Sequence, residues 1–266
     1  METRLHAGFF LRRNPRAVER AQSVTYFPAR KYTVNSENAG CGDLKACVVT
    51  GGSLNAFWAE KLENTGKCGV LAFGFNGLGL VSYKSELEGK TEIFHDVAGL
   101  SKATGGVVIS GCDTDTYGVF RHSAVIAEKG RILGVSDAAY SLDESEFRAG
   151  GGFRVYDTGA GRIGLLVADD VYFSEAAKVL SLSDADFIVC VYNRPVSSMT
   201  EIMARSSAFS CGVPVVLVAE QFVSAAGVSG EVMYSSRRDV NEFNVKLVKD
   251  YHKISTRRRG FYFEQS

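Results

Sequence analysis

The sequence predicts an α/β fold, a layered sandwich built as a single domain. Three observations predict it. Segments of strand and helix character alternate along the chain past residue 40. The chain has 266 residues, of which 45% are hydrophobic, so it is long and apolar enough to bury a sizeable core. It also contains no internal repeat and no low-complexity segment, which disfavours a solenoid or a disordered chain.

Each expected element rests on a short apolar run or on helical spacing. Apolar, β-branched runs bounded by glycine, proline or asparagine indicate strands, and apolar residues at helical spacing indicate helices. We expect strands at 45–50, 70–75, 106–110, 153–157, 163–168, 186–191 and 214–219, a hairpin of 117–127 with 131–135, antiparallel strands within 230–250, and helices at 54–62, 92–104, 199–210 and from 175 onward.

Charge and cysteine content narrow the functional classes. Thirty basic and thirty acidic side chains give a net charge of zero, which argues against a nucleic-acid or membrane-surface function based on bulk charge. No apolar run approaches the length of about 18 residues that a membrane span needs. The six cysteines lack C-x-x-C spacing, and Cys112 and Cys190 lie in apolar strands. We therefore expect reduced core thiols in a cytoplasmic protein.

The first forty residues differ from the rest. They carry several arginines and few acidic residues. We interpret residues 1–40 as a basic N-terminal extension with a short helix near 14–22, and residues 41–266 as the folded domain. An organellar transit peptide is the alternative interpretation of the extension, while the apolar run at 8–11 is too short for a secretory signal.

One segment, residues 157–195, combines a tight turn, a buried strand, a helix and a second strand. Thr158 and the run Gly161–Gly164 form the turn, Leu165–Val167 the strand, and a helix follows near Glu175. This order describes a β-α-β crossover, and functional sites in such layers lie at the carboxyl ends of strands. Ala168, Asp169 and Asp170 occupy that position.

This segment resembles the nucleophile region of the nitrilase, or carbon–nitrogen hydrolase, superfamily. In that family a T-x-x-G-[KR]-[IV]-G turn leads into a strand that ends at a catalytic cysteine, and the frame here places Ala168 at the cysteine. Further resemblances follow in the family's order, at residues 47–75, 122–134, 185–195, 205–213 and 245–263. The resemblance implies a nitrilase-like α-β-β-α sandwich.

The resemblance also implies where a catalytic triad would stand. Family members use a cysteine nucleophile, a glutamate base and a lysine that stabilises the oxyanion. The glutamate would follow the second strand, where this chain has Phe75, and the lysine would follow the hairpin, where it has Ala138. With Ala168 at the cysteine, all three polar groups are replaced by apolar ones. We therefore expect no catalytic residue at these three vestigial positions.

Other polar residues near these positions are candidates for ligand binding. The paired carboxylates could serve acid–base chemistry, or Asp170 could instead bind loop amides as a structural group. No histidine has a partner at ligand spacing, so we expect no metal site, and we expect no cofactor. The candidate ligand-binding residues are Asp169, Asp170, Tyr172, Glu146, Asn193 and Arg194.

Three functional hypotheses remain open. The first is a catalytically degenerate homologue that binds or assembles without hydrolysing amides or nitriles. The second is an active carbon–nitrogen hydrolase of the amidase type, with relocated or partner-supplied catalytic residues. The third is a small-molecule sensor that uses the vestigial pocket. The expected partner is a second copy, forming a dimer or a larger homo-oligomer, or an active homologue in a hetero-oligomer. We expect neither nucleic acid nor membrane as a partner.

Overall fold

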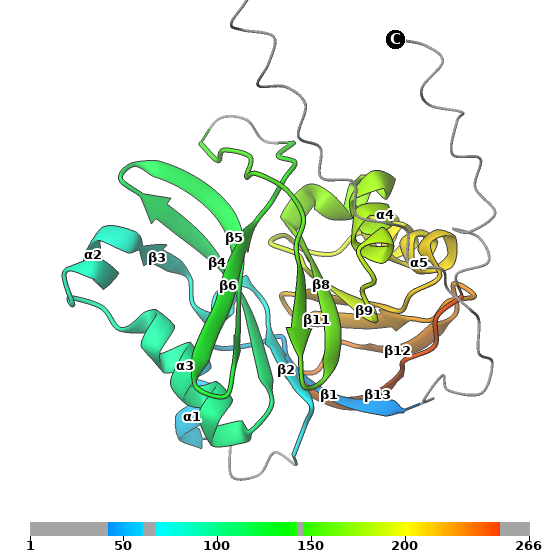
Figure 1. Cartoon of the computed structure of the whole chain (residues 1–266), viewed down its shortest axis with the longest axis horizontal. Coiled ribbons are helices and arrows are strands. Elements are labelled where there is room, and N and C mark those ends of the chain that lie inside the picture. The colour runs from blue at the N-terminus through cyan, green and yellow to red at the C-terminus, as the bar shows by residue number, and fades with distance from the viewer. Residues whose placement is uncertain (1–41, 61–66, 143–145, 251–266) are drawn as a thin grey trace, which may run out of the picture. The chain divides into compact units, whose positions relative to one another are not determined.

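The computed structural model describes residues 42–60, 67–142 and 146–250. The predicted basic extension and its helix lie outside these residues. The described residues form two sheets with helices on their outer faces (Figure 1). No helix in this part of the chain is long and apolar enough to cross a membrane.

The first sheet has seven strands in the order β13-β1-β2-β4-β5-β6, with β3 paired to β4. The strands β1, β2 and β4 are parallel, and β13, β5 and β6 pair antiparallel with their neighbours. The strands are β1 (Asp43–Val49), β2 (Val70–Phe73), β3 (Leu80–Ser82), β4 (Val107–Thr116), β5 (Val119–Glu128), β6 (Arg131–Asp137) and β13 (Val240–Lys246).

The second sheet has six strands in the order β12-β11-β10-β9-β8-β7. Its central strands β8, β9 and β10 are parallel, as the predicted β-α-β crossover requires. The strands are β7 (Val155–Thr158), β8 (Gly161–Val167), β9 (Phe187–Val191), β10 (Val215–Ala219), β11 (Phe222–Ala226) and β12 (Val232–Ser236).

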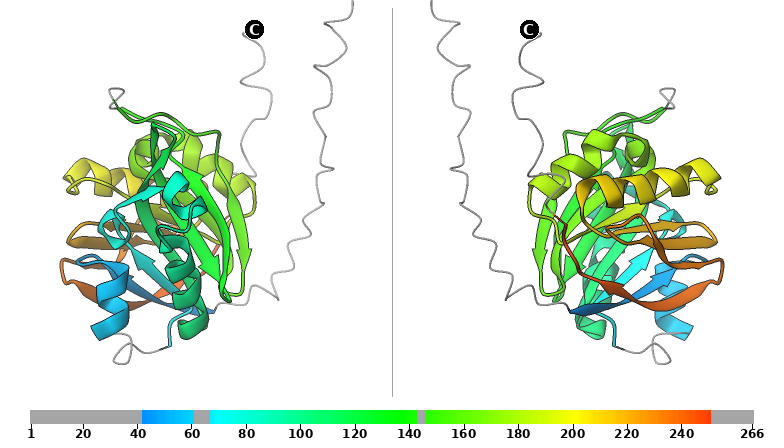
Figure 2. Two further views of the ribbon diagram at one scale, coloured as in Figure 1. Left: turned by 90° about the vertical axis from the view of Figure 1, so that its left-hand side faces the viewer. Right: turned by 90° about the vertical axis from the view of Figure 1, so that its right-hand side faces the viewer.

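Helices cover the outer face of each sheet, on opposite sides of the molecule (Figures 1 and 2). The first sheet packs against α1 and α3, and the second against α4 and α5. The helices are α1 (Leu54–Glu60), α2 (Tyr83–Leu87), α3 (Ile93–Thr104), α4 (Ser174–Leu182) and α5 (Ser198–Cys211), with short 3-10 turns η3 (Phe75–Gly77) and η4 (Ala168–Tyr172).

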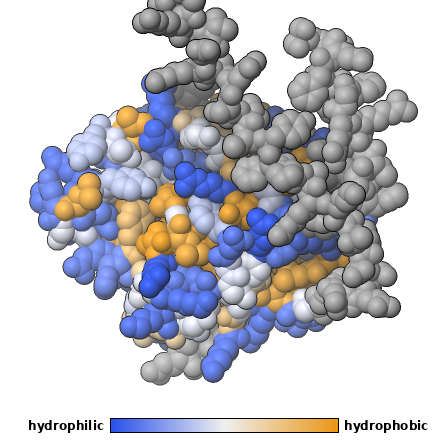
Figure 3. Space-filling view, in the orientation of Figure 1, coloured by the Kyte–Doolittle hydropathy of each residue, from blue (hydrophilic) through white to orange (hydrophobic). Residues whose placement is uncertain are grey.

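The largest apolar cluster lies between the two sheets. Alternate residues of each strand point into it: along β1, for example, Leu44, Ala46 and Val48 face inward, while Cys47 and Val49 face the helices. In the orientation of Figure 1, apolar side chains are visible at the centre of the face, where the edge strands of the two sheets lie (Figure 3). The described residues therefore form an α-β-β-α sandwich, which confirms the predicted fold.

The element boundaries differ from the predictions in identifiable places. The strand β4 continues to Thr116, because it pairs along its whole length with β5. The predicted strand at 70–75 ends at Phe73, and Phe75 begins the turn η3. The short elements β3 and α2 had no sequence signal long enough to predict. Because Phe75 lies in η3 and not on β2, its ring packs against the apolar cluster between the sheets.

Candidate functional site

Three strand ends border the apolar cluster between the sheets. Phe75 follows β2, Ala138 follows β6 and Ala168 follows β8. Ala138 and Ala168 are buried in the cluster between the sheets, and Phe75 packs against the same cluster. We call these three residues and their surroundings the apolar cup. The three positions that the sequence singled out therefore border the same apolar cluster, although their correspondence to the family triad stays a prediction.

Ala168 occupies a sharp turn between β8 and η4. Its side chain is fully buried and its φ angle is +50°, in the left-handed region that non-glycine residues seldom adopt. Such a conformation costs about 1–3 kcal/mol and persists where the surroundings impose it, often at functional sites. The strained turn projects the side chain of residue 168 from the end of β8. In this chain that side chain is only the methyl group of Ala168.

The carboxylate of Asp170 holds this turn in place. Its Oδ2 accepts a hydrogen bond from the Val167 amide at 3.2 Å, and its Oδ1 accepts from the amides of Ala139 and Tyr140, both at 2.9 Å. The carboxylate thus ties the turn after β8 to the loop after β6, next to Ala138. Burial raises the pKa of Asp170 to about 6, against the opposing effect of the three amides.

Asp169 makes a second link to the same loop. Its Oδ2 accepts a hydrogen bond from the Leu142 amide at 2.9 Å, and its Oδ1 pairs with the guanidinium of Arg194. Asp169 and Asp170 are only 2% and 1% exposed. Their oxygens contact backbone amides and, in the case of Asp169, the guanidinium of Arg194. This geometry matches the structural alternative for Asp170. Ligand binding by either carboxylate stays a prediction.

Aromatic rings fill the cup beside the two alanines. The Phe75 ring lies edge-on to the His122 ring, with 5.7 Å between centroids, and His122 stacks on Phe147 at 3.8 Å. Gly111 makes room for this arrangement: a Cβ atom there would lie 2.7 Å from Cδ2 of Phe75 and 2.6 Å from Cγ1 of Val191. The phenyl ring thus occupies the space that a smaller side chain at this position would leave open.

His122 is not the isolated histidine that its sequence spacing indicated. Asp113 lies directly opposite it in the β4–β5 pair, and the Asp113 carboxylate bonds His122 Nδ1 at 2.6 Å. Nδ2 of Asn193 lies 3.1 Å from His122 Nε2, while Oδ1 of Asn193 is buried with no hydrogen-bond partner. The hairpin register could have revealed the Asp113 pair. The stack on Phe147 comes from a loop and carried no local signal.

The remaining candidate ligand residues are dispersed. The Tyr172 hydroxyl bonds the hydroxyls of Tyr192 and Thr200, both at 2.8 Å, at the contact between η4 and α5. Glu146 is exposed. The structure therefore joins Asn193 to His122 and Arg194 to Asp169, and does not gather the six candidate residues around one space.

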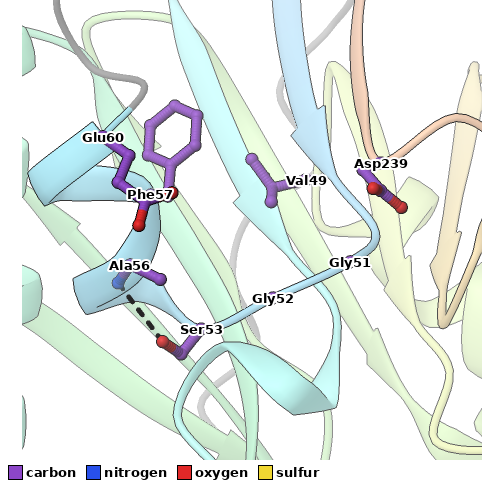
Figure 4. Close-up of a pocket in the computed structure, with 8 residues that line it drawn as sticks. All are labelled: Val49, Gly51, Gly52, Ser53, Ala56, Phe57, Glu60 and Asp239. Atoms are coloured by element: carbon purple, nitrogen blue, oxygen red, sulfur yellow. Dashed lines mark hydrogen bonds between the residues drawn. The ribbon is translucent and has the colours of Figure 1, made fainter.

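Two cavities in the described part of the chain lie outside the cup. One, of about 370 Å³, lies between the end of β1 and the start of α1, with the carboxylates of Glu60 and Asp239 on opposite sides (Figure 4). The other, of about 190 Å³, lies between Val135 and Arg154. Neither of these two cavities is lined by Phe75, Ala138 or Ala168.

Comparison with known structures shows the same architecture elsewhere. A carbon–nitrogen hydrolase from Helicobacter pylori superposes with a TM-score of 0.68 and 18% identity, covering 83% of this chain and 97% of that protein. An amidase from Nesterenkonia sp. superposes with a TM-score of 0.66 and 15% identity, covering 81% and 93%. At these identities the likeness shows the fold alone.

Sequence comparison adds to this likeness. A probable nitrilase of Schizosaccharomyces pombe is 26% identical over 102 residues, which cover 37% of this chain and 38% of that protein. The chain therefore matches less than half the length of this curated relative. The family profile described as carbon–nitrogen hydrolase matches residues 82–230, more than half of the chain. The chain therefore belongs to the carbon–nitrogen hydrolase family.

Proposed function

We propose that this chain is a carbon–nitrogen hydrolase homologue that does not hydrolyse carbon–nitrogen bonds and instead acts as a binding or assembly protein. The observation that carries the proposal is the apolar cup. At the three strand ends where the family's chemistry would need a thiolate, a carboxylate and an ammonium group, the chain has Ala168, Phe75 and Ala138. A phenyl ring and two methyl groups supply no nucleophile, base or oxyanion donor.

Two buried strand cysteines are poor replacements for a missing nucleophile. Cys112 on β4 and Cys190 on β9 are fully buried, and burial raises the pKa of both thiols. A thiol is nucleophilic as its thiolate, so a raised pKa and lack of access both oppose reaction. Cys190 is the core thiol that the sequence predicted.

Thiol labelling tests this part of the proposal. We expect iodoacetamide, applied to the native protein at pH 7.5 and followed by peptide mapping, to leave Cys112 and Cys190 unmodified. Among the described cysteines of the metal-free protein, Cys68 should react fastest, because it is only half-buried and a hydrogen bond from Cys47 lowers its pKa. Rapid, stoichiometric alkylation of Cys112 or Cys190 would support a relocated nucleophile and contradict the proposal.

Support for assembly comes from the outer face of α4 and α5, which faces the viewer in the right-hand view of Figure 2. Of the apolar residues on these helices, Ala176, Leu180 and Ala204 are buried, while Val179 and Phe209 are 41% and 49% exposed. Three more large apolar side chains on these helices are also exposed, namely Leu182, Met199 and Ile202. Contiguous exposed apolar side chains typically mark a protein interface.

We therefore expect the protein to form a homodimer through this α4–α5 face. Ile202→Glu and Phe209→Glu should each shift the protein toward monomer in sedimentation velocity at micromolar concentration, because each change buries a charge in an apolar interface. Leu87→Glu is the matched control, since it places the same charge at an exposed apolar position on α2 and should leave the dimer intact. A wild-type monomer at micromolar concentration would contradict the assembly.

One observation favours the alternative of an active hydrolase. The Asp113–His122 pair has the hydrogen bond that orients a histidine general base, and His122 contacts the ring at the cup. However, the second ring nitrogen of His122 already faces the Asn193 amide. An active enzyme of this type would lose turnover in His122→Gln, whereas the proposed binding protein has no turnover to lose.

A further inference from the structure

Two thiols and a carboxylate converge on the helix-covered face of the first sheet, away from the cup. Cys47 lies on β1, and Glu242 on β13 is directly opposite it in the antiparallel register, so both side chains point to the same face. Cys68 lies just before β2, the other neighbour of β1. The two sulfur atoms and a carboxylate oxygen all lie within 4.8 Å of one another.

This spacing is close to that of a metal site. Tetrahedral zinc, with Zn–S bonds of about 2.3 Å, separates two sulfur ligands by roughly 3.8 Å. Starting from separations of at most 4.8 Å, the three ligand atoms need to converge by only about 1 Å. Cys47 is fully buried, Cys68 is half-buried and Glu242 is exposed, so the group opens to solvent on its carboxylate side. Water can supply a fourth ligand there.

The charges around the group suit a divalent ion. Nζ of Lys45 lies 2.7 Å from Oε2 of Glu242, on the same face of the sheet. Two thiolates and one carboxylate carry three negative charges, which a divalent cation together with the Lys45 ammonium balances. Binding of the metal would displace the thiol protons to solvent.

We propose that Cys47, Cys68 and Glu242 bind one Zn²⁺ ion, with water as the fourth ligand and Lys45 as the charge-balancing neighbour. Thiolate ligands favour zinc over the hard ions Mg²⁺ and Ca²⁺. The site ties β1 to both of its neighbouring strands, so its role is structural support of this sheet edge. Residue spacing did not indicate this site, because Cys47 and Cys68 are separated by a helix and Glu242 lies on a distant strand.

Cobalt substitution of the full chain tests this site. The protein is treated with a chelator, kept reduced and titrated with Co²⁺ alone. We expect one equivalent to bind with a sulfur-to-cobalt charge-transfer band, which Zn²⁺ then abolishes. Cys68→Ser should weaken Co²⁺ binding more than about 100-fold, since even outer-shell partners contribute about 10–100-fold, and Glu242→Gln should weaken it about tenfold. Cys211→Ala, a thiol of the other helix layer, is the matched control and should change nothing.

Several results would overturn the proposal. One is the absence of a thiolate–cobalt band in the reduced wild type. Another is a band of undiminished affinity in Cys68→Ser or in Glu242→Gln, which would place the metal on other ligands. Glu242→Gln alters an exposed side chain, so it remains informative if Cys68→Ser fails to fold. A third is rapid oxidation of Cys47 and Cys68 to a disulfide by hydrogen peroxide in the presence of saturating Zn²⁺, since bound thiolates would be protected.

Discussion

Asp170→Ala should destabilise the protein by about 3–5 kcal/mol, more than any other single change at the cup. The substitution leaves three amides without their acceptor: the buried amide of Val167 and the partly buried amides of Ala139 and Tyr140. Each unsatisfied buried donor costs about 1–3 kcal/mol, and removal of a buried charge offsets part of that sum. Because a domain of this kind is stable by only about 5–15 kcal/mol, the loss should be plain in urea unfolding at pH 8, where Asp170 is ionised.

The matched control is Asp157→Ala. Asp157 lies at the other end of the same sheet edge, its side chain is 84% exposed, and its contact is a surface ion pair with Arg162. Such pairs contribute little, so the control should change stability by less than about 1 kcal/mol. Equal effects of the two substitutions would show that the Asp170 carboxylate does not hold the turn to the loop.

The triple variant Phe75→Glu, Ala138→Lys, Ala168→Cys should make the new thiol at 168 react with iodoacetamide at least about tenfold faster than in Ala168→Cys alone. In the single variant the thiol is buried, has no base and lies beside ionised Asp170, all of which keep it protonated. A neighbouring ammonium typically lowers the pKa of an acidic group by about one to three units. Hydrolytic activity of the triple variant should stay weak, because catalysis also needs residues that hold the three groups in position.

This experiment must distinguish the accessibility of the thiol at position 168 from its ionisation. Removal of the phenyl ring alone opens the cup, so Phe75→Ala with Ala168→Cys is the matched control: it provides space without a base or an ammonium group. Circular dichroism checks that each variant folds before its alkylation rate is compared. If the control reacts as fast as the triple variant, the three side chains do not interact, and the vestigial site has been placed wrongly.

The sequence predicted the layers well, because strands buried on both faces leave long apolar runs. Leu165–Val167 and residues 186–191 are such runs, and both are central strands. The apolar pattern predicted the wrong end for β2. Phe75 continues the pattern, although the strand ends at Phe73 and Phe75 begins the turn η3. An aromatic residue after a strand carries no local sign of whether it extends the strand or turns into the core.

The site was predicted less completely, for a different physical reason. Ala138 and Ala168 could be located, since each follows a recognisable strand. Contacts between distant segments could not: Phe147 stacks on His122 from a loop, and Asp169 pairs with Arg194 from the next strand end. Such contacts depend on how loops cross the sheet, which neither periodicity nor residue spacing records. The buried hydrogen bonds of Asp170 were predicted only as one of two alternatives.

Hydrolysis by the purified wild-type protein tests the central claim most directly. A panel of simple amides, nitriles and ureido compounds covers the bonds that the family's chemistry addresses, with ammonia release as the readout. The apolar cup predicts no turnover above that of the His122→Gln variant purified in parallel, because Phe75, Ala138 and Ala168 offer no nucleophile, base or oxyanion donor. Turnover that survives repurification and disappears in His122→Gln would contradict the account and establish an active hydrolase.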